Sequence, residues 1–118
     1  MCKVLVVDDN PDILTVLETI LTLNGFQVVA LSKGGEVYDS VFLLEPKVVL
    51  MDVNLGTHDG RNICMDIKSK TETKKANVIL LSANHNLKQS AFESLADDFI
   101  EKPFDINHLV NKVKGFCN

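Results

Sequence analysis

Residues 3–12 read KVLVVDDNPD, an apolar run followed by two carboxylates and a helix-start signal. Four of the first five residues of this stretch are Val or Leu, which is typical of a strand buried on both faces. Asn10 and Pro11 indicate that a helix follows, because Asn caps free backbone N–H groups and Pro fits the first helical position. The stretch therefore predicts a buried strand, an acidic turn and a helix.

Four further apolar runs follow along the chain. They are Gln27–Leu31, Lys47–Met51, Asn77–Leu81 and Asp98–Glu101. Longer amphipathic segments separate the runs, so strands are expected to alternate with helices. This alternation predicts an α/β domain with a parallel sheet that helices cover on both faces. In open sheets of this kind, ligands bind beyond the carboxyl ends of the strands.

The segments between the runs carry helix signals. The expected helices run from Pro11 to Asn24, from about Gly34 to Leu44, after a cap at Asp59, near Leu87–Leu95, and after a cap at Asp105. In the first helix Ile13, Leu17 and Leu21 recur every four residues and therefore share one face. Gly25 is expected to end that helix, because glycine accepts the left-handed conformation that often follows a helix.

The length and composition describe one acidic globular domain. The 118 residues suit a single domain spanning 1–118. Twelve basic and sixteen acidic residues give a net charge of −4, and without a Lys/Arg stripe the chain is a poor candidate for direct binding of nucleic acid. No apolar run is long enough to span a membrane and the N-terminus lacks a signal peptide, so we expect a cytoplasmic protein without membrane insertion.

The three cysteines, Cys2, Cys64 and Cys117, are odd in number and have no CxxC spacing. Reduced thiols in a cytosolic compartment explain this pattern more simply than a disulfide framework or a zinc site. Cys64 falls on the predicted third helix, where a small residue facing the core is expected.

Polar residues follow four of the predicted strands. Asp8 and Asp9 follow the first strand, Asp52 the third, Ser82 the fourth and Lys102 the fifth. Each residue alone is most simply a turn, cap or loop residue, but all of them fall at the same edge of one sheet. Clustered carboxylates repel each other unless a cation neutralises them, and Mg²⁺ suits a site of few carboxylates with water and phosphate oxygens. Together with a hydroxyl and a lysine, they predict a phosphoryl-transfer site.

Four motifs carry a resemblance to a known family over essentially all 118 residues. They are VLVVDDNPDI at 4–13, VVLMDVNLGTHDG at 48–60, VILLSA at 78–83 and DDFIEKPF at 97–104. As a set, they resemble the receiver domain of bacterial response regulators. The resemblance implies a flavodoxin-like, doubly wound (βα)5 fold, whose five-stranded parallel sheet has the strand order 2-1-3-4-5.

The resemblance also implies a role for particular residues. Asp52 matches the phosphoacceptor; Asp8, Asp9, Asp52 and the backbone carbonyl of Asn54 match the Mg²⁺ site; Ser82 and Lys102 match the groups that bind the phosphoryl oxygens; and Phe99 matches the aromatic switch residue. The bond between Lys102 and Pro103 is often cis in the family.

The implied function is that of a signalling switch. A histidine kinase or a histidine phosphotransfer protein would transfer a phosphoryl group to Asp52, and the altered surface would act on a downstream protein or a fused output domain. The domain would catalyse its own phosphorylation and dephosphorylation without turning over a separate substrate. Dimers through the fourth helix, fifth strand and fifth helix are common in the family, so a homodimer linked to phosphorylation is a further expectation.

Two other functions compete with this one. A receiver-like binding module that is not phosphorylated would be favoured by a missing acceptor, lysine or acidic pair, and none is missing. A small α/β enzyme or flavin carrier is disfavoured because the acidic turn after the first strand would repel a flavin phosphate unless a metal ion intervened. The sequence does not distinguish a stand-alone receiver from a fragment of a longer regulator or hybrid kinase.

Three residues depart from the family's usual pattern. Gly56 replaces a proline in the loop after Asp52, and His58 replaces an apolar residue in the same loop. These changes predict a more mobile loop with a solvent-facing histidine. Leu95 stands before the last strand, where glycine is usual.

Overall fold

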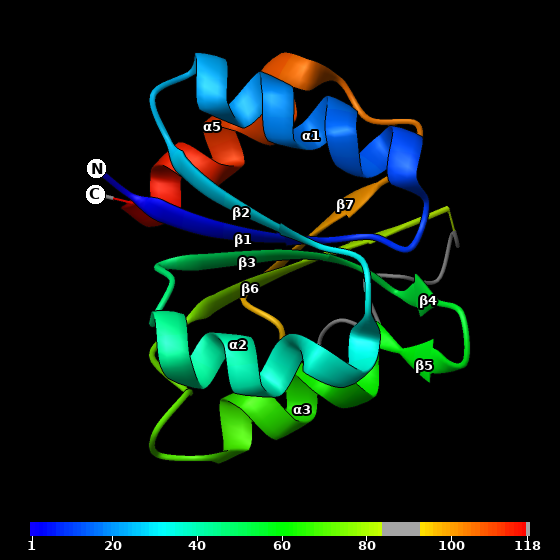
Figure 1. Ribbon diagram of the computed structural model, residues 1–118, viewed down its shortest axis with the longest axis vertical. Helices are drawn as coiled ribbons and strands as arrows, with labels where there is room; N and C mark the ends of the chain where they lie inside the picture. Colours follow the sequence, from blue (N-terminus) through cyan, green and yellow to red (C-terminus); the bar gives the residue numbers. More distant parts are fainter. Residues whose placement is uncertain (84–92, 118) are drawn as a thin grey trace.

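The computed structural model describes residues 1–83 and 93–117 and contains a five-stranded parallel sheet between two layers of helices (Figure 1). The strands are β1 (Lys3–Val7), β2 (Gln27–Leu31), β3 (Val48–Asp52), β6 (Asn77–Ser82) and β7 (Asp98–Glu101). Their order in the sheet is β2-β1-β3-β6-β7, and every neighbouring pair is parallel. Since β6 and β7 are the fourth and fifth strands of this sheet, the predicted order 2-1-3-4-5 is confirmed.

The helices cover the sheet in pairs. Figure 1 shows α1 (Pro11–Leu23) and α5 (Ile106–Cys117) on one face, and α2 (Val37–Leu44) and α3 (Gly60–Ser69) on the other. Successive residues of a strand point to opposite faces, so β1 contributes Val4 and Val6 to the core under α1 and α5, and Leu5 and Val7 to the core under α2 and α3. This two-sided burial explains why the strands read as continuous apolar runs.

The predicted caps are present at three helix starts. The side chain of Asn10 accepts hydrogen bonds from the N–H groups of Asp12 and Ile13, that of Asp59 from the N–H of Arg61, and that of Asp105 from the N–H of His108. The second helix begins later than expected, because residues Gly34–Glu36 form a 3₁₀ turn before α2. The predicted fourth helix near Leu87–Leu95 lies mostly outside the described residues.

A short antiparallel hairpin follows the third strand of the sheet and was not predicted. Strands β4 (Asn54–Leu55) and β5 (His58–Asp59) are joined by the two-residue turn Gly56–Thr57. Gly56 has a φ of +68°, as expected for glycine at the first central position of a type II′ turn. Proline fixes φ near −65°, so the proline that is usual here could not adopt this turn.

Cys2 and Cys117 form a disulfide bond, so the expectation of reduced thiols was wrong for these two residues. They are 115 residues apart in the sequence, but their Cα atoms are 5.8 Å apart, within the usual range for a disulfide. The fold brings them together because Cys2 precedes β1 and Cys117 ends α5, and Figure 1 shows both chain ends side by side. Cys64 is a buried free thiol, as expected, and burial raises its pKa to about 12.

In the parts of the chain that the structure describes, no helix combines the length and the apolar character needed to cross a membrane.

Leu95 adopts a left-handed backbone conformation just before β7. Its φ is +68° and its side chain is half exposed. A residue with a Cβ atom pays a steric penalty of about 1–2 kcal/mol in this region, whereas glycine does not. This conformation explains why glycine is usual at the position.

We expect Leu95→Gly to leave the free energy of unfolding unchanged or to raise it, because relief of the left-handed strain offsets the loss of a half-exposed side chain. Met65→Gly is the matched control, since Met65 is exposed in the middle of α3, where glycine costs about 1 kcal/mol. Chemical denaturation of both variants is the measurement. An equal loss of stability in the two variants would show that Leu95 carries no backbone strain.

Candidate functional site

Three carboxylates meet at the carboxyl edge of the sheet. Asp8 and Asp9 follow β1 and Asp52 ends β3, and one oxygen of each lies within 4.8 Å of the others. They converge because β1 and β3 are adjacent parallel strands, in register at Val7 and Met51. Asp8 and Asp52 are buried and Asp9 is exposed. The predicted acidic cluster is thus present, with one member open to solvent.

Asp8 is held from both sides by backbone hydrogen bonds. Its N–H donates to the carbonyl of Leu31 at 3.2 Å, and its Oδ1 accepts from the N–H of Asn10 at 2.9 Å. Its Oδ2 is buried and accepts no hydrogen bond from the described residues. A buried carboxylate oxygen without a donor is costly. An oxygen-binding cation at this point would satisfy it, so the donor set fits a hard divalent ion such as Mg²⁺.

Lys102 places a positive charge beside two of the carboxylates. Its Nζ lies 3.4 Å from Oδ2 of Asp52 and 3.6 Å from Oδ2 of Asp8. Its backbone N–H donates to the carbonyl of Ser82 at 2.9 Å, so β6 and β7 stay paired up to the site. The bond between Lys102 and Pro103 is cis, as the family resemblance implied.

Opposing effects act on the carboxyl group of Asp52. Burial is the largest and raises its pKa, and the nearby charge of Asp8 raises it further. The ammonium of Lys102 and the backbone N–H of Asn54 lower the pKa of Asp52, but the net result is a pKa above the ordinary value of 3.8. Burial thus disfavours the ionised carboxylate of Asp52, and ionising it in the folded protein costs stability.

The other predicted site residues surround this cluster. Ser82 is buried at the end of β6, one residue beyond Leu81, which pairs with Asp52. Asn54 is exposed at the start of β4. Phe99 lies on β7, partly buried, and packs against the core cluster beneath α2 and α3. The structure thus brings Ser82, Asn54 and Lys102 to the same edge as the carboxylates.

Gly60 supports the end of β3, a role that was not predicted from the sequence. Its N–H donates to the carbonyl of Val53 at 2.8 Å. A Cβ atom at this position would collide with the backbone carbonyl oxygen of Asp52. Glycine therefore lets the start of α3 pack directly against Asp52. The only sequence feature that could have indicated this role is the Asp-Gly pair at 59–60, which stands just before a predicted helix.

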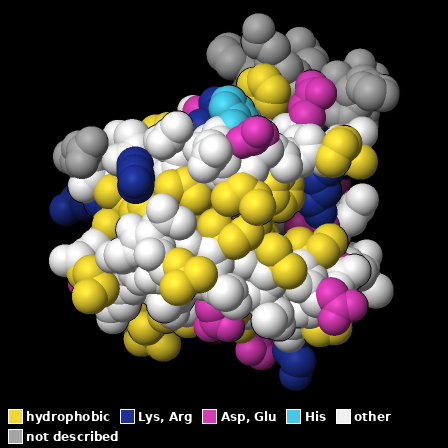
Figure 2. Space-filling view, turned by 90° about the horizontal axis from the view of Figure 1, so that it is seen from above, with side chains coloured by type: hydrophobic (Ala, Val, Ile, Leu, Met, Phe, Trp, Pro, Cys, Tyr) yellow, Lys and Arg dark blue, Asp and Glu magenta, His cyan; other side chains and the backbone are white. Residues whose placement is uncertain are grey.

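An apolar groove borders the site on one side. It has a volume of about 340 Å³ and lies between α1 and the segment after β7. Its lining residues are Asp12, Ile13, Val16, Lys102, Pro103 and Phe104. Figure 2 views the face that carries α1 and α5 and shows apolar side chains gathered across its middle. Val16 is half exposed there.

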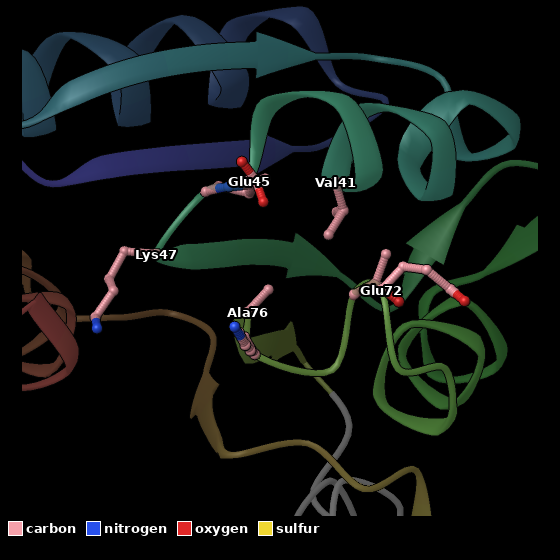
Figure 3. A pocket seen from close by; sticks show the side chains of 8 residues that line it. Val41, Glu45, Lys47, Glu72 and Ala76 are labelled. Atoms are coloured by element: carbon pink, nitrogen blue, oxygen red, sulfur yellow. The ribbon is translucent and has the colours of Figure 1, made fainter.

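A second cavity, of about 230 Å³, lies at the opposite edge of the sheet. Its lining includes Glu45 and Lys47, which precede β3, and Glu72, which precedes β6. Figure 3 shows these charged side chains pointing in different directions, with Val41 and Ala76 between them. They do not converge on a common point, so the acidic edge is the candidate site.

Residues 4–114 match the response regulator receiver domain family. A putative response regulator from Chloroflexus aurantiacus J-10-fl is 28% identical, with 98% of this chain and 97% of that chain covered and a TM-score of 0.92. The beryllofluoride-activated DrrB receiver domain is 33% identical, with coverage of 98% and 97% and a TM-score of 0.81.

A third similar structure is the receiver domain of a sensor histidine kinase from Pseudomonas aeruginosa PAO1, which has a magnesium ion coordinated in its active-site cleft. It is 24% identical, covers 98% of this chain and 97% of its own, and has a TM-score of 0.89. At this identity the likeness concerns the fold. Because the family match spans nearly the whole of the 118 residues, this chain belongs to the response regulator receiver domains, the phosphoacceptor switches of two-component signalling.

Proposed function

We propose that this chain is a phosphorylation switch in which the carboxylate of Asp52 accepts a phosphoryl group, with residues 1–118 acting as one receiver domain. The observation that carries the proposal is the placement of Asp52, which is 7% exposed, beside the ammonium of Lys102 at 3.4 Å and the carboxylate of Asp8. A buried nucleophile with a cation at contact distance suits a reaction that brings in an anionic group.

Mg²⁺ is the proposed cofactor. Asp8, Asp9, Asp52 and the backbone carbonyl of Asn54 would hold it. The buried Oδ2 of Asp8, which accepts no hydrogen bond from the described residues, supports this assignment. When bound, the ion supplies positive charge for the oxygens of the incoming phosphoryl group. The remaining contributions come from the chain itself.

In the proposed reaction, an oxygen of Asp52 attacks the phosphorus of a phosphohistidine. A new O–P bond forms as the P–N bond breaks, and the donor imidazole leaves with the bonding electron pair. Lys102 offsets the negative charge on the phosphoryl oxygens, and the hydroxyl of Ser82 donates a hydrogen bond to one of them. Water later breaks the acyl phosphate and restores the carboxylate, so the domain would promote both of its own reactions.

Signalling requires a second conformation. A phosphoryl group brings nearly two negative charges, which would draw Ser82 toward Asp52 and let Phe99 turn further inward. Moving such an equilibrium from 1:99 to 99:1 takes about 5.5 kcal/mol of differential stabilisation. Phe99 has no hydroxyl to hydrogen-bond in an exposed position, which favours its packed state, and in this structure the ring already packs against the core.

The proposed donor is a histidine kinase or a histidine phosphotransfer protein, and the groove beside Lys102 supports a docking site for it. Ile13, Val16 and Phe104 present apolar surface at the rim of the site. Covering this surface would bring a donor histidine to Asp52 and exclude water from it.

Incubation with acetyl phosphate and Mg²⁺ should give one phosphoryl adduct in intact-mass analysis. The adduct should disappear with EDTA, because the cluster needs a cation to admit an anion, and in Asp52→Asn, which lacks the nucleophile. If the wild type forms neither this adduct nor a beryllofluoride complex, the function becomes that of an unphosphorylated binding module.

Asp52→Asn should also raise the melting temperature at pH 7 by a few degrees. The folded-state pKa of Asp52 lies above the ordinary value of 3.8, so the ionised group lowers stability at every pH above that folded-state pKa. This cost shrinks as the pH falls and vanishes below 3.8.

Thermal melts from pH 7 to pH 3.5 measure this difference. Asp66→Asn serves as the control, because Asp66 is exposed in α3 and its 4.0 Å pair with Lys70 contributes little. A variant of Asp52 that melts below the wild type at pH 7 would contradict a buried, costly carboxylate.

Val16→Asp should slow phosphorylation by a phosphohistidine protein donor while leaving phosphorylation by acetyl phosphate unchanged. A charge in the groove costs apolar contact with a protein, whereas a small donor makes no such contact. Leu23→Asp is the control, because Leu23 is exposed at the far end of the same helix. If Val16→Asp and the wild type are phosphorylated by the protein donor at equal rates, the groove is not part of the docking site.

A further inference from the structure

The loop that carries part of the proposed metal site is the β4–β5 hairpin. It begins at Asn54, two residues beyond Asp52, and turns at Gly56. Gly56 leaves this turn without the restraint of proline. Some other contact must therefore fix the hairpin if the carbonyl of Asn54 is to hold a metal ion.

One side of the hairpin is fixed by α3. The N–H of Gly60 donates to the carbonyl of Val53 at 2.8 Å, and the side chain of Asp59 accepts from the N–H of Arg61 at 2.9 Å. These bonds secure both chains of the hairpin at its base. They leave its tip, including His58, to be held by other contacts.

On the other side, the side chain of His58 covers the two glycines that follow β2. A Cβ atom added to Gly34 would lie 2.8 Å from Cβ of His58 and 3.0 Å from its Cγ, and one added to Gly35 would lie 3.5 Å from its Nε2. His58 therefore occupies space that exists only because residue 34 lacks a side chain. The expected solvent exposure of His58 holds for its outer surface, but its inner surface packs on the backbone.

This contact connects two parts of the proposed metal site. The segment it touches follows directly from Leu31, whose carbonyl accepts the N–H of Asp8. On the hairpin side, His58 pairs across from Leu55, the neighbour of Asn54. The His58 side chain thus links the strand end that positions Asp8 to the loop that positions Asn54.

We infer that His58 is a positioning residue for the metal site, which it serves by packing on Gly34 and holding the hairpin beside Asp8. The inference rests on the proposed function, because it assigns His58 to the Mg²⁺ site of that function. It also gives the two departures a common explanation: Gly56 removes one restraint from the loop, and His58 with Gly34 supplies another.

Calorimetric titration with Mg²⁺ alone, on the whole chain, tests the inference. His58→Ala should raise the Kd for Mg²⁺ about tenfold, since residues that orient metal ligands have effects of this size. His58→Met should restore binding, because an apolar side chain of similar length can cover Gly34. Gly34→Ala should weaken binding as His58→Ala does, because the added methyl displaces His58.

Gly35→Ala is the matched control and should bind Mg²⁺ as the wild type does, because its Cβ would make only ordinary contacts with the ring. Amide NMR of the metal-free proteins supplies a second readout, in which the Asn54 signal should shift in His58→Ala and Gly34→Ala but not in Gly35→Ala. An unchanged Kd in His58→Ala would overturn the inference alone. A wild type that binds no Mg²⁺ would overturn the proposed metal site and the inference with it.

Discussion

Parallel strands that end together force their terminal side chains together, and here that constraint brings Asp8, Asp9 and Asp52 within a few ångströms. Only Lys102 offers a nearby positive charge among the described residues. The repulsion is tolerated because the backbone leaves these groups little freedom: Asp8 is bonded on both sides, and Gly60 packs against the carbonyl of Asp52. The fold thus fixes three carboxylates close together, and their combined negative charge attracts a cation.

The layered core makes this possible. The central strands β1, β3 and β6 are buried on both faces, so a shift of one strand end would disturb two apolar clusters at once. The site combines residues from these strand ends with residues from the segments that follow them. Asp52 and Ser82 end buried strands, Lys102 follows the last strand, and Asn54 belongs to the hairpin. The core on both faces of the sheet therefore fixes Asp52 and Ser82 more directly than it fixes Asn54.

The strands and the acidic edge could be predicted because they depend on local patterns and on the parallel arrangement of the sheet. Lys3–Val7 and Gln27–Leu31 were placed to the residue. The hairpin at Gly56 was not foreseen, since it depends on the sign of one φ angle, and the partner of His58 is a glycine that follows a different strand. The disulfide between Cys2 and Cys117 was not predicted for a related reason. The spacing of cysteines in the sequence does not show that the two chain ends meet in the fold.

That disulfide has a topological consequence. With Cys2 joined to Cys117 across 115 positions, nearly the whole backbone becomes a covalent circle. Hydrolysis of one peptide bond in any loop within the circle opens the ring but releases no fragment, so the molecule gains the mass of a single water and stays in one piece. Two separate cuts are needed before any segment can depart. The protein therefore has the connectivity of a cyclic polypeptide, although it is built from a linear chain.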